Sequence, residues 1–182
     1  MELTEDRTIN APRATVWAAL FDPEVLKACV PGCQELTGSA EEGFAAVVVQ
    51  KVGPVKATFK GAVTMADVVA GESCTLVGEG KGGAAGFAKG EARVALQDAE
   101  DGATTLSYVV DAKVGGKLAQ LGSRIVDGFA RKMAQDFFTR FQEQVEPPKA
   151  EAEAEAEDAD EGDSEQTEDA PKKGWLKRTF SS

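Results

Sequence analysis

The chain has 182 residues, 42% of them hydrophobic, and a formal net charge of −11 at neutral pH. This length suits one domain of ordinary size followed by a tail. We expect neither a secretory signal nor a stretch apolar enough to cross a bilayer, and therefore a cytoplasmic protein. The acidic charge repels a phosphate backbone, which excludes nucleic acid as the expected partner.

The residue types argue against a metal site and against common kinds of catalysis. The sequence contains no histidine and only three cysteines, and Cys29, Cys33 and Cys74 do not have the spacing of a zinc site. We expect them to be reduced. Histidine is the side chain most used for proton transfer near neutral pH. Its absence makes an enzyme less favoured without excluding one, and we assign no catalytic residue and no metal ligand.

The first part of the chain predicts a strand and two short helices. Residues 4–9 are expected to form the strand. Asn10 and Pro12 are expected to begin the first helix, with the asparagine as its cap. Apolar spacing predicts this helix over residues 14–21 and a second one over residues 25–29.

From residue 44 onward the pattern changes to period two, with turn residues between the runs. This predicts five more antiparallel strands, at residues 44–51, 56–68, 73–80, 88–97 and 104–114. Apolar residues then recur every three or four positions from Leu118 to Val145, which predicts one long helix of about 28 residues that ends before two prolines. The order predicts an α+β domain whose last helix covers the concave face of an antiparallel sheet.

Small residues dominate the expected inner face of this sheet. Alternation places Gly61, Gly78, Gly80, Gly90 and Ala112 inward, while charged residues occupy the outward positions. Such residues cannot fill the space beneath a helix to the density of an ordinary protein interior. Either a cavity remains, or the glycines let the sheet bend strongly so that the helix sinks onto it. Both interpretations stay open at this stage.

The end of the chain changes composition twice. Residues 146–170 are acidic and of low complexity, which predicts a disordered tether. Residues 171–182 carry four basic residues and no acidic one, with apolar and basic residues on opposite sides of a helical wheel. This pattern is typical of a weak anchor on an anionic membrane surface, although a solubilising end or a protein-docking motif are alternatives. The expected membrane contacts are Lys172, Lys173, Trp175, Leu176, Lys177, Arg178 and Phe180.

Several motifs point to a known family: Val30-Pro31-Gly32-Cys33, Lys60-Gly61, residues 86–92, and above all residues 114–124 followed by Phe137-Phe138. Through them the chain resembles the CoxG family of carbon monoxide dehydrogenase subunits, a branch of the START-like (SRPBCC) helix-grip superfamily. The resemblance implies a helix-grip domain over residues 1–145 with a cavity for an apolar ligand. It also implies recruitment of a molybdenum CO dehydrogenase, or a related molybdenum hydroxylase, to the cytoplasmic membrane. A respiratory quinone such as menaquinone is the implied ligand, with no covalently bound cofactor.

We therefore expect a non-enzymatic adaptor, peripheral on the inner face of the cytoplasmic membrane. One alternative is a helix-grip enzyme of the cyclase or hydratase kind that acts on a hydrophobic small molecule through Tyr108 and an inward carboxylate. Another is a docking protein that holds no ligand. Alternation and helical spacing give the expected ligand contacts, with Phe87 at the mouth of the cavity: Phe59, Leu76, Phe87, Tyr108, Leu121, Ile125, Phe129 and Met133.

Overall fold

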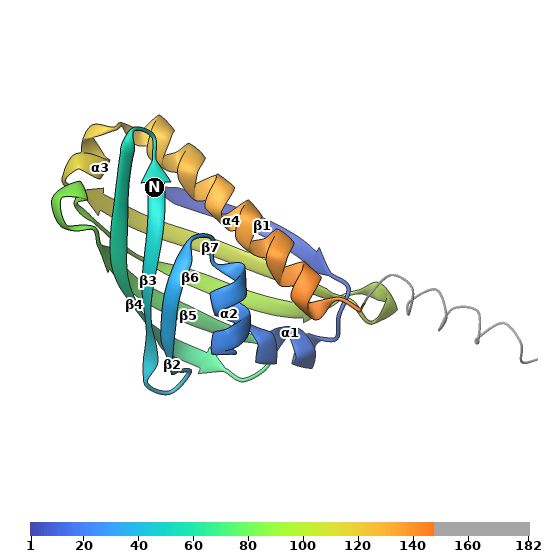
Figure 1. Ribbon diagram of the computed structural model, residues 1–182. Coiled ribbons are helices and arrows are strands. Elements are labelled where there is room, and N and C mark those ends of the chain that lie inside the picture. Colours follow the sequence, from blue (N-terminus) through green and yellow to red (C-terminus); the bar gives the residue numbers. More distant parts are fainter. Residues whose placement is uncertain (148–182) are drawn as a thin grey trace, which may run out of the picture. The chain divides into compact units, whose positions relative to one another are not determined.

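The computed structural model describes residues 1–147, which form one antiparallel sheet with a long helix across its concave face (Figure 1). The seven strands lie in the order β1-β7-β6-β5-β4-β3-β2. The predicted α+β class and the closing helix are confirmed. The strands are β1 (Glu2–Ile9), β2 (Cys33–Ser39), β3 (Gly43–Val52), β4 (Val55–Val69), β5 (Ser73–Lys81), β6 (Phe87–Asp98) and β7 (Thr104–Gly115).

The helices cover one face of this sheet. They are α1 (Arg13–Leu20), α2 (Pro23–Cys29), α3 (Lys117–Gln120) and α4 (Ser123–Val145), with short 3₁₀ turns η1 (Gly83–Ala85) and η2 (Glu100–Gly102). None of the helices in residues 1–147 combines the length and the hydropathy needed to span a membrane. The expected membrane segment 171–182, and all but the first two residues of the expected tether, lie outside the described residues.

The predicted cap of the first helix is wrong. Pro12 occupies the cap position of α1, where no side chain accepts a hydrogen bond, and the backbone N–H of Asn10 donates instead to Glu146 Oε1 at 3.0 Å. This contact joins the start of α1 to the end of α4. Helix α2 has the side-chain cap that α1 lacks, because the Asp22 carboxylate accepts from the backbone N–H groups of Glu24 and Val25 in its first turn.

The predicted uninterrupted helix is also wrong, because α3 and α4 are separate. Gly122 lies between them with φ 85° and ψ 153°, a conformation that other L-residues avoid. Helix α4 therefore begins as a separate helix at Ser123, and the apolar positions of α3 and α4 do not form one continuous stripe. Val126 is buried as a result, while Ile125 is 42% exposed.

Strand β2 was not predicted. It lies at one edge of the sheet, pairs only with β3 and shows no alternation of buried and exposed residues. A register shift between Cys33 and Glu35 further disturbs its period. An edge strand without a buried face lacks the period-two signal on which strand prediction depends.

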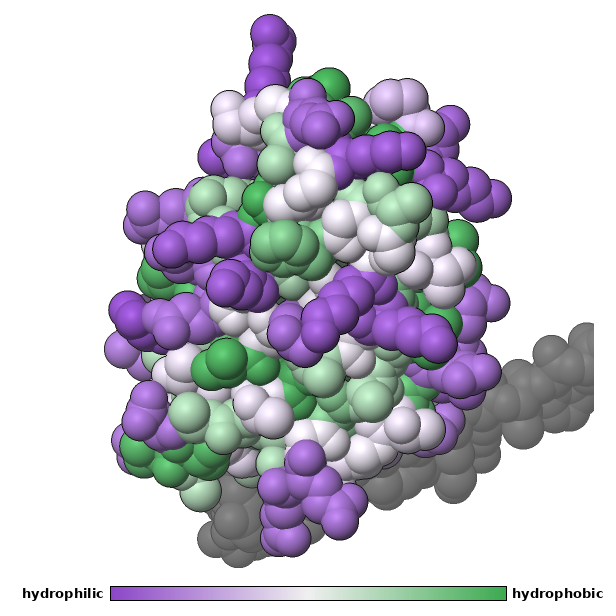
Figure 2. All heavy atoms as spheres, turned by 90° about the vertical axis from the view of Figure 1, so that its left-hand side faces the viewer, coloured by the Kyte–Doolittle hydropathy of each residue, from purple (hydrophilic) through white to green (hydrophobic). Residues whose placement is uncertain are grey.

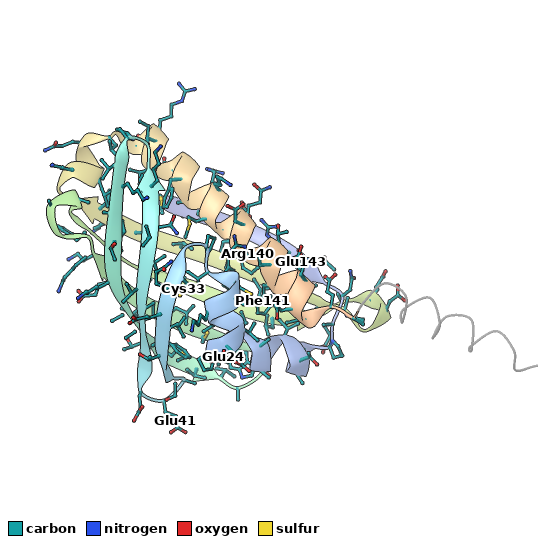
Figure 3. The ribbon with its side chains drawn as sticks, viewed as in Figure 1. Glu24, Cys33, Glu41, Arg140, Phe141 and Glu143 are labelled. Carbon is teal, nitrogen blue, oxygen red and sulfur yellow. The ribbon has the colours of Figure 1, made fainter. Side chains whose placement is uncertain are left out.

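The hydrophobic core lies beneath the C-terminal half of α4, where it meets α1, α2 and the sheet. Phe141 is fully buried at its centre (Figure 3). The ring of Phe137 stacks on that of Phe141 with centroids 5.8 Å apart, and the ring of Phe138 stacks on Tyr108 of β7 at 5.0 Å. These aromatic contacts fix this half of the helix against the sheet.

We predict that Phe141→Ala lowers the free energy of unfolding by about 3–5 kcal/mol, because it empties a site in the packed core. Chemical denaturation followed by circular dichroism measures the change. Phe87→Ala is the matched control: Phe87 is 44% exposed, so its loss is expected to be below about 1 kcal/mol. Equal losses in the two variants would contradict this location of the core.

Candidate functional site

A pocket of about 400 Å³ lies beneath the N-terminal half of α4, beyond the aromatic core. Its helix wall consists of Leu118 from α3 and Val126, Phe129, Ala130 and Met133 from α4. All but one of the side chains that line it are apolar. The remaining lining residues come from the chain start, the turn after α2 and the sheet: Met1, Val30, Val48, Gln50, Val52, Phe59, Gly61, Gly80, Ala88, Ala112 and Val114.

The pocket exists because the sheet beneath it carries almost no side-chain volume. A Cβ added at Gly80 would meet no atom within 4 Å, and one added at Gly61 would meet only the Glu79 carbonyl oxygen at 3.4 Å. Gly90 differs, since a Cβ there would lie 2.2 Å from the Asp111 carbonyl oxygen. The two interpretations of the glycines therefore each hold at a different position: Gly90 permits close backbone approach, and Gly80 leaves open space.

The open space continues along the concave face of the sheet. An adjoining hollow of about 380 Å³ shares Gly80, Ala88 and Ala112 with the pocket and extends to Leu76 and Val110. The pocket and this hollow together form a trough along the concave face, which α4 covers only over the pocket. Most of the hollow is bordered by small or apolar residues, and Glu79, Lys89 and Glu91 also border it.

Four of the eight expected ligand contacts lie in this trough. Phe59, Phe129 and Met133 line the pocket itself, and Leu76 lines the adjoining hollow. Phe59 also packs its ring against Gly82, where a Cβ would approach it to 2.4 Å. For these four residues, the positions predicted from strand alternation and helical spacing lie around the same open space in the structure.

The other four expected contacts do not line the pocket. Leu121 is half-buried beside the break before α4, and Ile125 is exposed close to Gly53 in the β3–β4 turn. The ring of Phe87 covers Gly115 at the surface. Tyr108 faces inward as predicted, but at the core end of the sheet. Sequence reasoning also passed over Val126 and Gln50, which do line the pocket.

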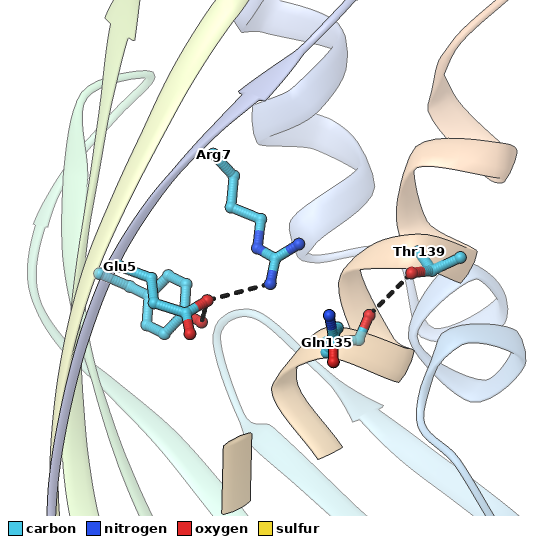
Figure 4. Close-up of polar contacts among 5 residues, drawn as sticks. Glu5, Arg7, Gln135 and Thr139 are labelled. Carbon is cyan, nitrogen blue, oxygen red and sulfur yellow. Dashed lines mark hydrogen bonds and ion pairs between the residues drawn. The ribbon is translucent and has the colours of Figure 1, made fainter. Parts of the chain in front are cut away.

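A polar cluster on the inner face of β1 holds the Tyr108 hydroxyl. Tyr108 Oη donates to Glu5 Oε2 at 2.8 Å, and Arg7 Nη2 donates to the same oxygen at 2.9 Å (Figure 4). The Arg7 guanidinium also lies over the Phe138 ring, 5.2 Å from its centroid. Glu5 is an inward carboxylate that the sequence analysis missed, although it stands between Leu3 and Ile9, which are both buried.

The charges of this cluster stabilise one another. The hydrogen bond from Tyr108, with help from Arg7, lowers the pKa of Glu5. Burial and the neighbouring carboxylate raise the pKa of Tyr108 to about 12. Glu5 is thus ionised and Tyr108 protonated at neutral pH. Because none of the three residues lines the apolar pocket, the cluster joins β1 to β7 and α4 rather than serving the pocket.

A wider hollow of about 630 Å³ is on the opposite, outward face of the sheet. Exposed charged side chains line much of it: Glu79, Lys89, Glu91, Asp111 and Lys113. An apolar ligand gains little from such a hydrated floor. The pocket beneath α4 is therefore the candidate site.

Comparison with protein families finds a match over residues 6–146 to CoxG, described as a subunit of carbon monoxide dehydrogenase. Among solved structures, a conserved protein from Geobacillus kaustophilus is 28% identical, with a TM-score of 0.74 over 80% of this chain and 95% of that chain. A START superfamily protein from Mycobacterium smegmatis is 15% identical, with a TM-score of 0.59 over 79% of this chain and 96% of that one. The second likeness shows a START-like fold. Comparison with curated proteins finds no match.

We predict that the alkaline absorbance titration of the folded chain has its midpoint near pH 12, because Tyr108 is the only tyrosine. The unfolded chain is expected to titrate near 10. This raised pKa contributes stability that is fully present below pH 10 and is lost as the pH rises through about 12. The lowered pKa of Glu5 contributes stability that is lost instead as the pH falls through its folded value.

Glu5→Gln provides the control for this titration. It removes the negative charge that opposes ionisation of Tyr108, so the midpoint of the folded variant is expected to fall toward 10. Circular dichroism at each pH verifies that the chain remains folded. A native midpoint near 10, or no difference between the variant and the parent chain, would argue against the cluster.

Proposed function

Since the chain belongs to the CoxG family of carbon monoxide dehydrogenase subunits, we propose that it is a non-enzymatic adaptor that binds an apolar ligand between α4 and the sheet. The observation that carries the proposal is the pocket of about 400 Å³ with its apolar lining. That volume falls in the range of about 300–1,000 Å³ typical of small-molecule sites. The START-like fold supports the same role.

A respiratory quinone such as menaquinone is the proposed ligand, and a molybdenum CO dehydrogenase, or a related molybdenum hydroxylase, is the proposed partner. The apolar walls suit a prenyl chain and the flat face of a quinone ring. The open trough toward Leu76 offers room for a ligand longer than the pocket alone. The name of the family supports the choice of enzyme partner.

We further propose that the adaptor works as a peripheral protein on the inner face of the cytoplasmic membrane. The end of the domain that carries α3 displays hydrophobic residues among hydrophilic side chains (Figure 2). Ile125 is exposed on α4, with Arg124 next to it and Lys117 exposed on α3. Apolar side chains beside cations favour contact with anionic lipid, in the same way as expected of residues 171–182.

Two other functions fit the structure less well. A cyclase or hydratase needs titratable groups that converge on its substrate, but no Asp, Glu, Lys, Arg or Tyr side chain lines the pocket in the described part of the chain. A docking protein without a ligand has no use for open space beside Gly80. The pocket therefore favours a carrier over both.

We predict that Gly80→Val abolishes ligand binding without unfolding the domain. The new side chain enters the open space at Gly80, and valine is a good strand residue. Tryptophan fluorescence quenching by menadione bearing one prenyl group is the measurement, with an expected loss of affinity of about tenfold or more. Ala62→Val adds similar bulk on the outward face of the neighbouring strand and is expected to bind normally. Unchanged binding by Gly80→Val would contradict the site.

We also predict that deletion of residues 172–182 abolishes co-sedimentation with anionic liposomes, because it removes the basic and aromatic residues expected to contact lipid. Neutral liposomes provide the reference for charge-independent binding. The deleted segment lies outside the described residues, so the pocket and its binding of the prenylated menadione are expected to persist. Full binding of the deletion variant to anionic liposomes would rule out this segment as the anchor.

A further inference from the structure

We propose that Gln50 forms the head-group subsite of the pocket and hydrogen-bonds the polar end of an uncharged, otherwise apolar ligand. The inference rests on the proposed ligand-binding function and adds the chemical class of the ligand. Val48, Gln50 and Val52 alternate along β3 and all three line the pocket. Gln50 carries the only polar side chain of that lining among the described residues.

Gln50 is partly buried, so each polar group of its amide gains from a hydrogen bond wherever a ligand excludes water from the pocket. The structure uses only part of its capacity: Gln50 Nε2 donates to the Pro31 carbonyl oxygen in the turn after α2. A carbonyl oxygen can only accept, so the nitrogen of the amide must face Pro31, and this fixes the orientation of the amide. Oε1 and the second N–H are left without a partner in the described part of the protein.

The turn after α2 holds this amide in place. Gly32, with φ 72°, brings the turn so close to β3 that an added Cβ would lie 2.2 Å from the Val49 carbonyl oxygen. The Val49 N–H donates to the Gly32 carbonyl oxygen at 2.9 Å. The would-be Cβ of Gly32 is also only 3.2 Å from Gln50 Nε2. The amide is therefore positioned before a ligand arrives, which lowers the entropic cost of binding it.

These contacts select the kind of ligand. A hydroxyl group can donate to Gln50 Oε1, and a carbonyl group can accept from the second N–H of Nε2. Met1 also lines the pocket, and its positively charged amino group donates to the Ala112 carbonyl oxygen at 2.9 Å. No charged side chain faces the pocket within residues 1–147. The geometry thus favours an uncharged lipid whose head presents a hydroxyl or carbonyl group, such as a prenyl alcohol, a quinone or a quinol.

The test compares two probes with the same isoprenoid chain, farnesol with a hydroxyl head and farnesene without one. Their dissociation constants are measured on the full chain and on Gln50→Met, which keeps the length of the side chain and removes its hydrogen bonds. The ratio of the farnesol constant to the farnesene constant is expected to rise about fivefold in the variant, the change that one lost hydrogen bond causes. The two probes differ in the free energy of transfer out of water, but this difference is the same for both forms of the protein. It therefore cancels when the two ratios are compared.

The outcomes separate the subsite from the proposed function. If neither probe binds the parent chain, the ligand-binding function itself fails. If both bind but Gln50→Met leaves the ratio unchanged, or weakens both probes equally, Gln50 only supports the turn at Pro31 and the subsite is overturned. Val47→Met, on the opposite face of β3 and outside the pocket lining, is the control and is expected to leave the ratio unchanged.

A measurement on the parent chain covers the case in which Gln50→Met does not fold. The side-chain amide resonances of Gln50 in nuclear magnetic resonance spectra are expected to shift on titration with farnesol, and to shift much less with farnesene. The same resonances moving equally with both probes would overturn the subsite, because a hydrogen bond to the head group distinguishes the two ligands.

Discussion

The unequal distribution of side-chain volume along the inner face of the sheet determines the rest of the structure. A helix of 23 residues is a rod of about 34 Å, and α4 lies across strands that are bulky at one end and bare at the other. At the bulky end Leu96, Leu106 and Tyr108 meet the aromatic residues of the helix. At the bare end Gly80, Ala88 and Ala112 leave the helix without a floor. Because the rod is held at its aromatic half, the other half cannot close the gap.

Polar groups are distributed in a way that keeps this gap apolar. The inward charges of β1 are used within the cluster of Glu5, Arg7 and Tyr108, at the seam between β1 and α4. The remaining charges of the central strands point outward, as the strand register places Glu79 opposite Lys89 and Glu91 opposite Asp111. Within residues 1–147 no Asp, Glu, Lys, Arg or Tyr side chain lines the pocket, so these side chains offer no general acid or base there. The pocket can hold an oily molecule, and this distinction underlies the choice of a carrier over an enzyme.

Sequence patterns predicted the sheet well and the start of the long helix poorly. Strands β3 to β7 have a clean period of two between turn residues, so their ranges were predicted to within two residues. The prediction extended one helix across Gly122, because helical spacing does not reveal the positive φ of that residue. As a result it placed Leu121 and Ile125 in the pocket instead of Val126. Alternation selected the correct face for Tyr108 but could not say which end of that face is filled, since this depends on how residues distant in sequence stack. Glu5 and Gln50 could have been found by alternation alone, because Glu5 falls in the inward row of β1 between Leu3 and Ile9, and Gln50 lies between Val48 and Val52 in the inward row of β3.

Separate halves of α4 serve stability and binding, and this follows from the cost of an empty pocket. Apolar surface that faces the open space beside Gly80 contributes little to folding, so the aromatic end supplies more of the packing between α4 and the sheet. A ligand that fills the pocket adds its own binding free energy to the folded state, in proportion to the logarithm of its concentration over its dissociation constant. The ligand therefore replaces the packing that the small residues omit. Substitutions near Phe141 therefore change the free energy of unfolding of the empty protein. Substitutions near Gly80 and Gln50 change the increase in that free energy that a bound ligand provides.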